Sequence, residues 1–135
     1  MICDIHDSTI SSVGGASGIR DHDGLHSVWS RDEASCHYGD PDAVRIGALL
    51  AHGIMRSHPF VDGNKRSAYA VMLLTLASNG LQFEAGSTEV SDMIIASAAE
   101  GWDVDRLESA IRVIVQVDPV YQLLFDYDRR LEPVI

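Results

Sequence analysis

A nine-residue stretch a little before the middle of the chain, HPFVDGNKR, contains most of the side chains that could perform chemistry. It brings together a titratable ring, a carboxylate, an amide, an ammonium and a guanidinium: His58, Asp62, Asn64, Lys65 and Arg66. The whole chain is acidic, with Lys+Arg 10 against Asp+Glu 20 and a formal net charge of −10, and Lys65 is its single lysine. Two adjacent cations in such a chain predict a bound anion.

A helix predicted to begin near Asn64 gives this anion a site. The first backbone N–H groups of a helix have no intrahelical partner, and they lie at the positive end of the helix dipole. Such an end binds phosphate readily, and Gly63 removes a side chain where the anion would approach. Lys65 and Arg66 are unfavourable beside a positive dipole end unless an anion compensates them, so their position favours a phosphate ligand.

The remaining polar residues of the stretch fit the same chemistry. Asp62 supplies a hard oxygen ligand, and a carboxylate together with phosphates is how proteins usually hold Mg²⁺. His58 is placed to act as a general base toward an incoming hydroxyl, and Phe60 is expected to anchor the turn in the core. Arg56, close before the stretch, is a further candidate for a phosphate or target contact. The stretch therefore predicts phosphoryl or nucleotidyl transfer from a Mg-nucleotide. A purely structural interpretation stays open, because a His-Pro helix end, an Asp-Gly turn and an exposed Lys-Arg pair are each common alone.

The elements around the stretch are predicted to be helical, because the apolar spacing is mostly that of helices. Asp40 and Pro41 favour a helix start, Pro59 ends that helix near Ser57, and Gly80 is a natural end for the next one. A short extended piece is expected at 81–83. We predict an all-α bundle of about six helices around a buried central helix, with helices at 2–13, 24–31, 41–57, 64–79, 87–99 and 104–117.

Bulk properties narrow the class of protein. A chain of 135 residues favours one domain that needs no disulfide scaffold, and it has two cysteines. The negative charge argues against a broad nucleic-acid or anionic-membrane surface. No signal peptide is visible and the longest apolar run is too short to span a bilayer, so we expect a cytoplasmic protein. Ligand-type residues near the N-terminus, His6 among them, lack the spacing of a zinc site.

The stretch HPFVDGNKR resembles the signature of the Fic/Doc superfamily, His-x-Phe-x-Asp/Glu-Gly-Asn-Gly/Lys-Arg, and every defining position is filled. Lys after Asn is typical of the Doc branch, the death-on-curing toxins of type II toxin–antitoxin systems. IHDSTISSVGGASGIRD is similar to the opening of Doc-type toxins, NKRSAYAVMLLTLASNG to their central helix, and VSDMIIASAAEGWDVDRLESAI to their last two helices. The resemblance covers about residues 1–115 and implies a compact Fic/Doc-like helical fold.

This resemblance implies a role for each motif residue. His58 would be the catalytic base, Asp62 the Mg²⁺ ligand, and the residues that bind the nucleotide phosphates would be Gly63, Asn64, Lys65 and Arg66. The implied cofactors are Mg²⁺ and ATP or another nucleoside triphosphate. Doc-type enzymes transfer the γ-phosphate to a threonine of elongation factor Tu and so arrest translation, whereas Fic enzymes with Gly after Asn transfer AMP. Adenylyl transfer with the same residues stays an alternative.

Partners are implied in the same way. Self-inhibited Fic proteins carry a Ser/Thr-x-x-x-Glu-Gly/Asn helix, but Ala96 stands four residues before Glu100-Gly101. We therefore expect a separate Phd-like antitoxin, no direct contact with nucleic acid and no membrane contact. A catalytically inactive antitoxin-binding module is a further alternative, although all motif residues are intact. The expected organisation is a Fic/Doc-like domain over 1–117 and a C-terminal extension over 118–135, predicted to be helical and packed on the same domain.

Overall fold

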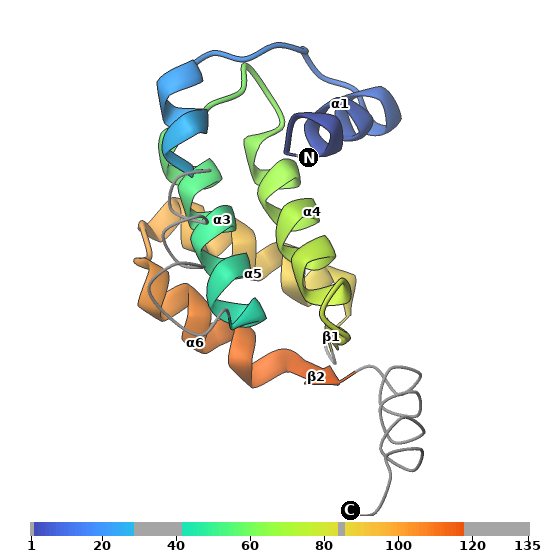
Figure 1. Ribbon diagram of the computed structural model, residues 1–135, viewed down its shortest axis with the longest axis vertical. Helices are drawn as coiled ribbons and strands as arrows, with labels where there is room; N and C mark the ends of the chain where they lie inside the picture. The colour runs from blue at the N-terminus through green and yellow to red at the C-terminus, as the bar shows by residue number, and fades with distance from the viewer. Residues whose placement is uncertain (1, 29–41, 84–85, 118–135) are drawn as a thin grey trace, which may run out of the picture.

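The computed structural model describes residues 2–28, 42–83 and 86–117 of the chain. Helical residues 22–28 lie between the first two named elements. The named elements, in chain order, are α1 (Ile2–Val13), α3 (Ala43–Ser57), α4 (Asn64–Ala77), β1 (Leu81–Phe83), α5 (Ser87–Glu100), α6 (Val104–Ile114) and β2 (Val115–Val117). Figure 1 shows α3 and α4 side by side, with α5 and α6 covering one face of this pair and α1 beside the start of α4. The predicted all-α bundle with a central helix is confirmed.

Helix α4 forms the centre of the bundle through one face. Ala68, Val71, Met72 and Leu76 are fully buried, and they pack among the core side chains of α3, α5 and α6. Leu74 on the other side is 47% exposed, so the predicted central helix is buried on one face and not all round. The helix ends at Ala77, and the chain then turns through Gly80, whose φ of 75° is the left-handed geometry expected of a glycine there.

The end of α6 differs from the sequence prediction. A helix was expected to run to Val117, but α6 stops at Ile114 and residues 115–117 form β2. This strand pairs antiparallel with β1, with Leu81 opposite Val117 and Phe83 opposite Val115. The β-branched sequence VQV suits an extended strand, and the pairing with β1 satisfies backbone groups that a frayed helix end would leave open. Its partner, the short extended piece expected at 81–83, is confirmed.

The start of α3 also differs. The N-cap is Asp42, two residues after the predicted Asp40, and its carboxylate accepts a hydrogen bond from Val44 N at 2.9 Å. The same carboxylate pairs with Arg112 of α6. An Asp at the N-cap satisfies an orphan backbone donor, and here the same side chain also connects the start of α3 to α6. Asp40 and Pro41 lie outside the described residues.

The N-terminal part of the chain packs against the turn between α3 and α4, residues 58–63, the motif turn. Helix α1 has the predicted bounds, and the irregular segment 14–21 follows it. Ile19 in this segment forms an antiparallel bridge with Phe60, and Val61 N donates to Gly18 O at 3.0 Å. Segments far apart in sequence thus form one end of the bundle.

Within the described ranges, none of the helices has both the length and the apolar character needed to cross a membrane. The predicted extension at 118–135 lies outside these ranges, so the assignment of domains at 1–117 and 118–135 stays a prediction.

The Asp42 cap leads to a stability prediction. Asp42→Ala should lower the free energy of unfolding by about 1 kcal/mol, because a backbone donor of α3 loses its acceptor. Asp42→Ser keeps a capping oxygen and loses the exposed Arg112 pair, which is worth little, so it should stay within about 0.5 kcal/mol of the parent protein. Urea unfolding at neutral pH measures both variants. Equal losses would show that the ion pair, not the cap, matters.

The same contribution should depend on pH. The hydrogen bond from Arg112 holds the pKa of Asp42 below its usual value. The stabilisation by this carboxylate is therefore present above the ordinary Asp pKa of about 3.9 and is lost as the pH falls through the lowered value. The difference between the parent protein and Asp42→Ala should shrink in that acidic range.

Candidate active site

His58 occupies the C-cap of α3 in a strained backbone conformation. Its φ of 45° and ψ of 56° are left-handed, and it is the one non-glycine residue with positive φ in the described ranges. Such a conformation costs on the order of 1–3 kcal/mol and persists only where neighbours enforce it. Pro59 is part of the reason, since it disfavours helical geometry at the residue before it. The predicted end of this helix near Ser57 is confirmed.

Arg20 holds this helix end from the segment 14–21. Its Nε donates to His58 O at 2.8 Å and its Nη2 donates to Ser57 O at 2.9 Å. The backbone N–H of Arg20 donates to Pro59 O at 2.6 Å. The guanidinium thus satisfies two carbonyls at the negative end of the α3 dipole, where a cation is favourable. The His58 ring is exposed and starts from a backbone that is fixed on both sides.

The middle of the turn is fixed by Phe60 and Asn64. Phe60 is 1% exposed, as predicted for an anchor, and its ring stacks on the ring of His6 in α1, with centroids 3.8 Å apart. The Asn64 side chain donates to Phe60 O at 3.0 Å and accepts from Phe60 N at 3.1 Å. Asn64 therefore holds the turn together as well as beginning α4.

Gly63 is the N-cap of α4 and permits the close approach of α1. Its φ of 75° is left-handed, and a Cβ at this position would lie 3.1 Å from Ile10 Cδ1. No side chain caps α4. The structure gives no hydrogen-bond acceptor within the described ranges for the backbone N–H of Asn64, Lys65 or Arg66. These donors at a helix N-terminus form the geometry expected of an anion site.

The Asp62 carboxylate is exposed and held by backbone donors. Gly63 N donates to Oδ1 at 2.7 Å, and Ala16 N donates to Oδ2 at 3.3 Å. The pKa of Asp62 is held below its usual value, first by the hydrogen bond from Gly63 and next by the one from Ala16. The nearby Arg66 and His6 lower it further. The group is therefore ionised throughout the neutral range, as a ligand for a hard cation must be.

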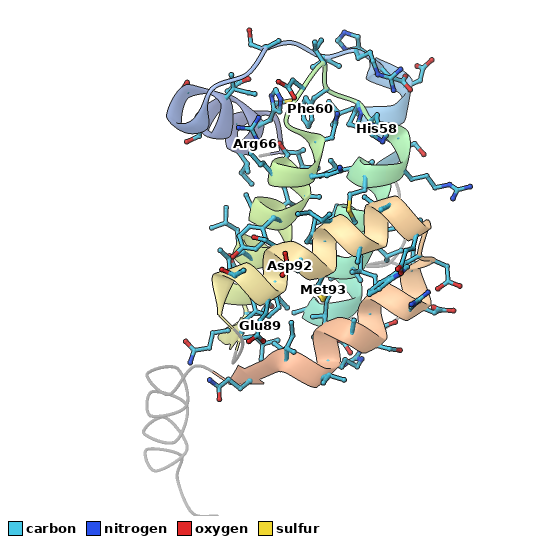
Figure 2. The ribbon with its side chains drawn as sticks, turned by 180° about the vertical axis from the view of Figure 1, so that it is seen from behind. His58, Phe60, Arg66, Glu89, Asp92 and Met93 are labelled. Atoms are coloured by element: carbon cyan, nitrogen blue, oxygen red, sulfur yellow. The ribbon has the colours of Figure 1, made fainter. Side chains whose placement is uncertain are left out.

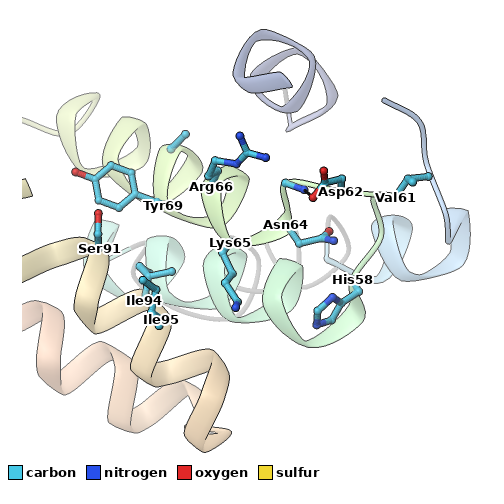
Figure 3. A pocket seen from close by; sticks show the side chains of 12 residues that line it. His58, Val61, Asp62, Asn64, Lys65, Arg66, Tyr69, Ser91, Ile94 and Ile95 are labelled. Atoms are coloured by element: carbon cyan, nitrogen blue, oxygen red, sulfur yellow. Dashed lines mark hydrogen bonds between the residues drawn. The ribbon is translucent and has the colours of Figure 1, made fainter. Parts of the chain in front are cut away.

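The two cations of the motif lie on different sides of the first turn of α4. Figure 3 shows Lys65 on the same side as His58, whereas Arg66 and Asp62 lie on the side of α1. Arg66 Nη1 donates to Gly14 O at 3.0 Å, so part of this guanidinium is already engaged. The structure gives Lys65, which is exposed, no ion pair with any described residue. Lys65 is thus the more available cation.

A cavity of about 840 Å³ opens beside this turn. All six predicted site residues line it: His58, Asp62, Gly63, Asn64, Lys65 and Arg66. Its other walls come mainly from α4 and α5, through Tyr69, Ala70, Ser91, Ile94 and Ile95. One end of the cavity is therefore rich in charge and the other mostly apolar, a combination that suits a ligand with a charged and an apolar part.

A hard divalent cation fits this donor set only in part. Asp62 is ionised and exposed, but no group of three or more His, Cys, Asp or Glu residues within the described ranges could hold a metal. Mg²⁺ commonly binds through one or two carboxylates and takes its other ligands from substrate phosphates and water. The residues present thus fit Mg²⁺ that arrives with a nucleotide better than a resident ion.

Several residues that fix the site were not predicted as such. Figure 2 shows Phe60 on the turn, Arg66 at the start of α4 and His58 at the end of α3. His6 lies 56 positions before its partner Asp62 and Arg20 lies 38 positions before its partner His58, so no local pattern could mark them. Arg56, the further candidate for a phosphate contact, is exposed and does not line the cavity.

Gly15 offers a test of how Asp62 is held. A Cβ on Gly15 would lie 2.6 Å from Asp62 Oδ2, whereas a Cβ on Gly14 would meet no atom within 4 Å. Both glycines have positive φ, so alanine costs similar backbone strain at each. Gly15→Ala should displace the carboxylate from Ala16 N and raise the Asp62 pKa toward its usual value, while Gly14→Ala should not. Carboxyl-carbon NMR titration measures this, and equal pKa values in both variants would contradict it.

Comparison with known proteins agrees with the motif. Residues 1–76 match the Fic/DOC family. The chain is 31% identical over 110 residues to "Protein kinase doc" of Escherichia phage P1, covering 80% of this chain and 86% of that protein. It is 30% identical over 109 residues to "Toxin Doc" of Mycolicibacterium smegmatis (strain ATCC 700084 / mc(2)155), covering 79% of this chain and 72% of that protein. This chain belongs to the Fic/Doc family.

Proposed function

We propose that this protein is a Doc-type toxin kinase, which transfers the γ-phosphate of a Mg-nucleotide to a hydroxyl of a protein target. The observation that carries the proposal is the placement of a histidine, a lysine without an ion pair among the described residues, and an uncapped helix N-terminus around one cavity. The two relatives are named as a protein kinase and as a toxin, which supports this branch of the family over others.

In this proposal His58 is the general base. Its exposed ring accepts the proton of the target hydroxyl as that oxygen attacks the γ-phosphorus, and the bond from this phosphorus to the β-phosphate oxygen breaks to release the nucleoside diphosphate. A general base of this kind is typically worth 10²–10⁴-fold in rate. The left-handed backbone at His58, fixed by Arg20 and Pro59, sets the position from which the ring acts. A pre-set base avoids an ordering cost during the reaction.

The phosphates are bound by the start of α4. The backbone N–H groups of Asn64, Lys65 and Arg66 donate to phosphate oxygens, and Gly63 lines the cavity directly before them. Lys65 and Arg66 stabilise the negative charge of the transferring group, which is the main task of a phosphoryl-transfer site. Asp62 is the residue that would hold Mg²⁺, and the bound ion would neutralise phosphate charge.

Lys65 supports phosphate transfer over AMP transfer. Its ammonium has no carboxylate partner in the described ranges and lies on the His58 side of α4. A long cation at this position occupies volume where the β- and γ-phosphates of an AMP-donating nucleotide would lie. It therefore favours a nucleotide bound in the opposite orientation, with the γ-phosphate toward the acceptor hydroxyl. Adenylyl transfer is the second candidate, because every other group in the proposed site would serve it equally.

The target and the partner rest on family membership. We propose a threonine of elongation factor Tu as the acceptor, which would make translation arrest the outcome in the cytoplasm. A Phd-like antitoxin is proposed as the partner that restrains the activity. A catalytically inactive antitoxin-binding module is disfavoured because His58, Asp62, Lys65 and Arg66 all line the cavity.

His58→Asn tests the base. Asparagine tolerates left-handed backbone, so the helix end should persist while the base is lost. Intact-mass spectrometry of elongation factor Tu, incubated with Mg²⁺, ATP and this protein, should show one added phosphoryl group. The variant should slow this at least about 10²-fold, whereas His22→Ala, at an exposed histidine outside the cavity, should match the parent. An unmodified factor with the active parent protein would exclude this target.

Lys65 variants test the choice of phosphorus. Lys65→Gly removes both charge and bulk, so phosphate transfer should fall about 10²-fold or more and AMP addition should appear. Lys65→Gln removes the charge but keeps most of the bulk, so it should lose phosphate transfer without gaining AMP transfer. The mass added to the target distinguishes these products. AMP addition by the unmodified protein would overturn the kinase assignment and leave the second candidate.

A further inference from the structure

His6 connects α1 to the motif turn through two separate contacts. Its side chain is 1% exposed, and its Nε2 lies 2.6 Å from Asp62 O. Its ring also lies flat on Phe60, with an interplanar angle of 5°. One buried side chain thus contacts the ring of Phe60 and the carbonyl of Asp62, the residues on the two sides of Val61.

The hydrogen bond fixes which ring nitrogen carries hydrogen. A carbonyl oxygen only accepts, so His6 Nε2 must be the donor toward Asp62 O. His6 Nδ1 lies 3.6 Å from Asp7 Oδ1, and the Asp7 carboxylate is 71% exposed. That contact is long and solvated, so the carbonyl of Asp62 is the structurally important partner of this ring.

Holding this carbonyl also orients the start of α4. The Asp62–Gly63 peptide is planar and trans, so its C=O and its N–H point in opposite directions. With Asp62 O directed at His6, the Gly63 N–H points away from the His6 ring and donates to the Asp62 carboxylate. Gly63 itself is close to this ring, since a Cβ there would lie 3.6 Å from His6 Nε2.

His6 does not line the cavity, whereas Asp62, Gly63 and Asn64 do. Any effect of His6 on a bound nucleotide must therefore pass through the turn. We propose that His6 is a positioning residue: its Nε2–H holds the Asp62–Gly63 peptide so that the carboxylate of Asp62 and the first N–H groups of α4 face the same ligand. This inference deepens the proposed transfer function and rests on it for its catalytic consequence.

The test distinguishes the hydrogen bond that His6 Nε2–H donates from the stacking of its ring on Phe60. His6→Phe keeps a flat ring against Phe60 and removes the Nε2–H. We expect kcat for phosphate transfer to fall about 10–100-fold, the range seen when supporting groups of a site are removed, with KM for ATP changed less than about threefold. Amide hydrogen exchange over residues 60–64 should accelerate about tenfold, because the turn loses an anchor.

Two further variants complete the test. His6→Gln retains an N–H donor but loses the stack, so it should recover a large part of kcat and of the exchange protection. Asp7→Asn alters only the solvated contact of Nδ1 and should match the parent protein in both measurements. A His6→Phe protein with parental kcat and parental exchange would overturn the inference. If His6→Phe does not fold, His6→Gln decides: a loss in kcat as large as about 100-fold would show that stacking, not donation, is what matters.

Failure of the proposed kinase function can be distinguished from failure of the proposed role of His6. If the parent protein transfers no group from ATP, the kinase assignment fails, but amide exchange in the three variants still reports whether Nε2–H holds the turn. Accelerated exchange in His6→Phe with protection in His6→Gln would then support the positioning role by itself. Parental exchange in His6→Phe would reject that role regardless of activity.

Discussion

The burial of Phe60 is the contact through which the motif turn is joined to the rest of the molecule. The turn between α3 and α4 belongs to neither helix, and besides its backbone hydrogen bonds to the segment 14–21 it is held by side-chain anchors. Phe60 supplies one by stacking on His6 and pairing with Ile19, two residues from the N-terminal part of the chain. A buried aromatic ring contributes on the order of 2–3 kcal/mol, enough to fix a short turn. Because Phe60 is fixed in the core, the polar residues on either side of it are held in defined positions.

Left-handed residues at both ends of the turn show how that geometry is maintained. At Gly63 the left-handed conformation costs little, because glycine has no Cβ. At His58 it is strained, and the strain is offset by the hydrogen bonds that Arg20 makes to the end of α3. Strain of this kind is concentrated where a side chain must be aimed. Here the strained residue is the exposed histidine of the motif, which lines the cavity.

Arg66 and Lys65 lie on opposite sides of the first turn of α4 and have different surroundings. Arg66 is tied to Gly14 O beside Asp62, so it helps to hold the acidic side of the turn together. Lys65 lies on the other side without an ion-pair partner in the described ranges, next to the apolar wall that contains Ile94 and Ile95. The Lys65 ammonium is exposed and has no described carboxylate beside it, so it is available to a phosphate. In sequence the two cations are adjacent and equivalent.

Local chemistry determined much of this protein from sequence alone: the bounds of α1, the helix end before Pro59, the turn at Gly80 and the helix start after Gly63 all follow from backbone preferences of neighbouring residues. That the six candidate site residues lie close together was also predictable, because they fall within nine consecutive positions, and they line one cavity. Tertiary structure alone decided that Arg112 of α6 pairs with the Asp42 cap of α3, where β2 replaces the end of α6, and that His6 and Arg20 hold the turn. These depend on partners some thirty or more residues away, and no local preference encodes a distant partner.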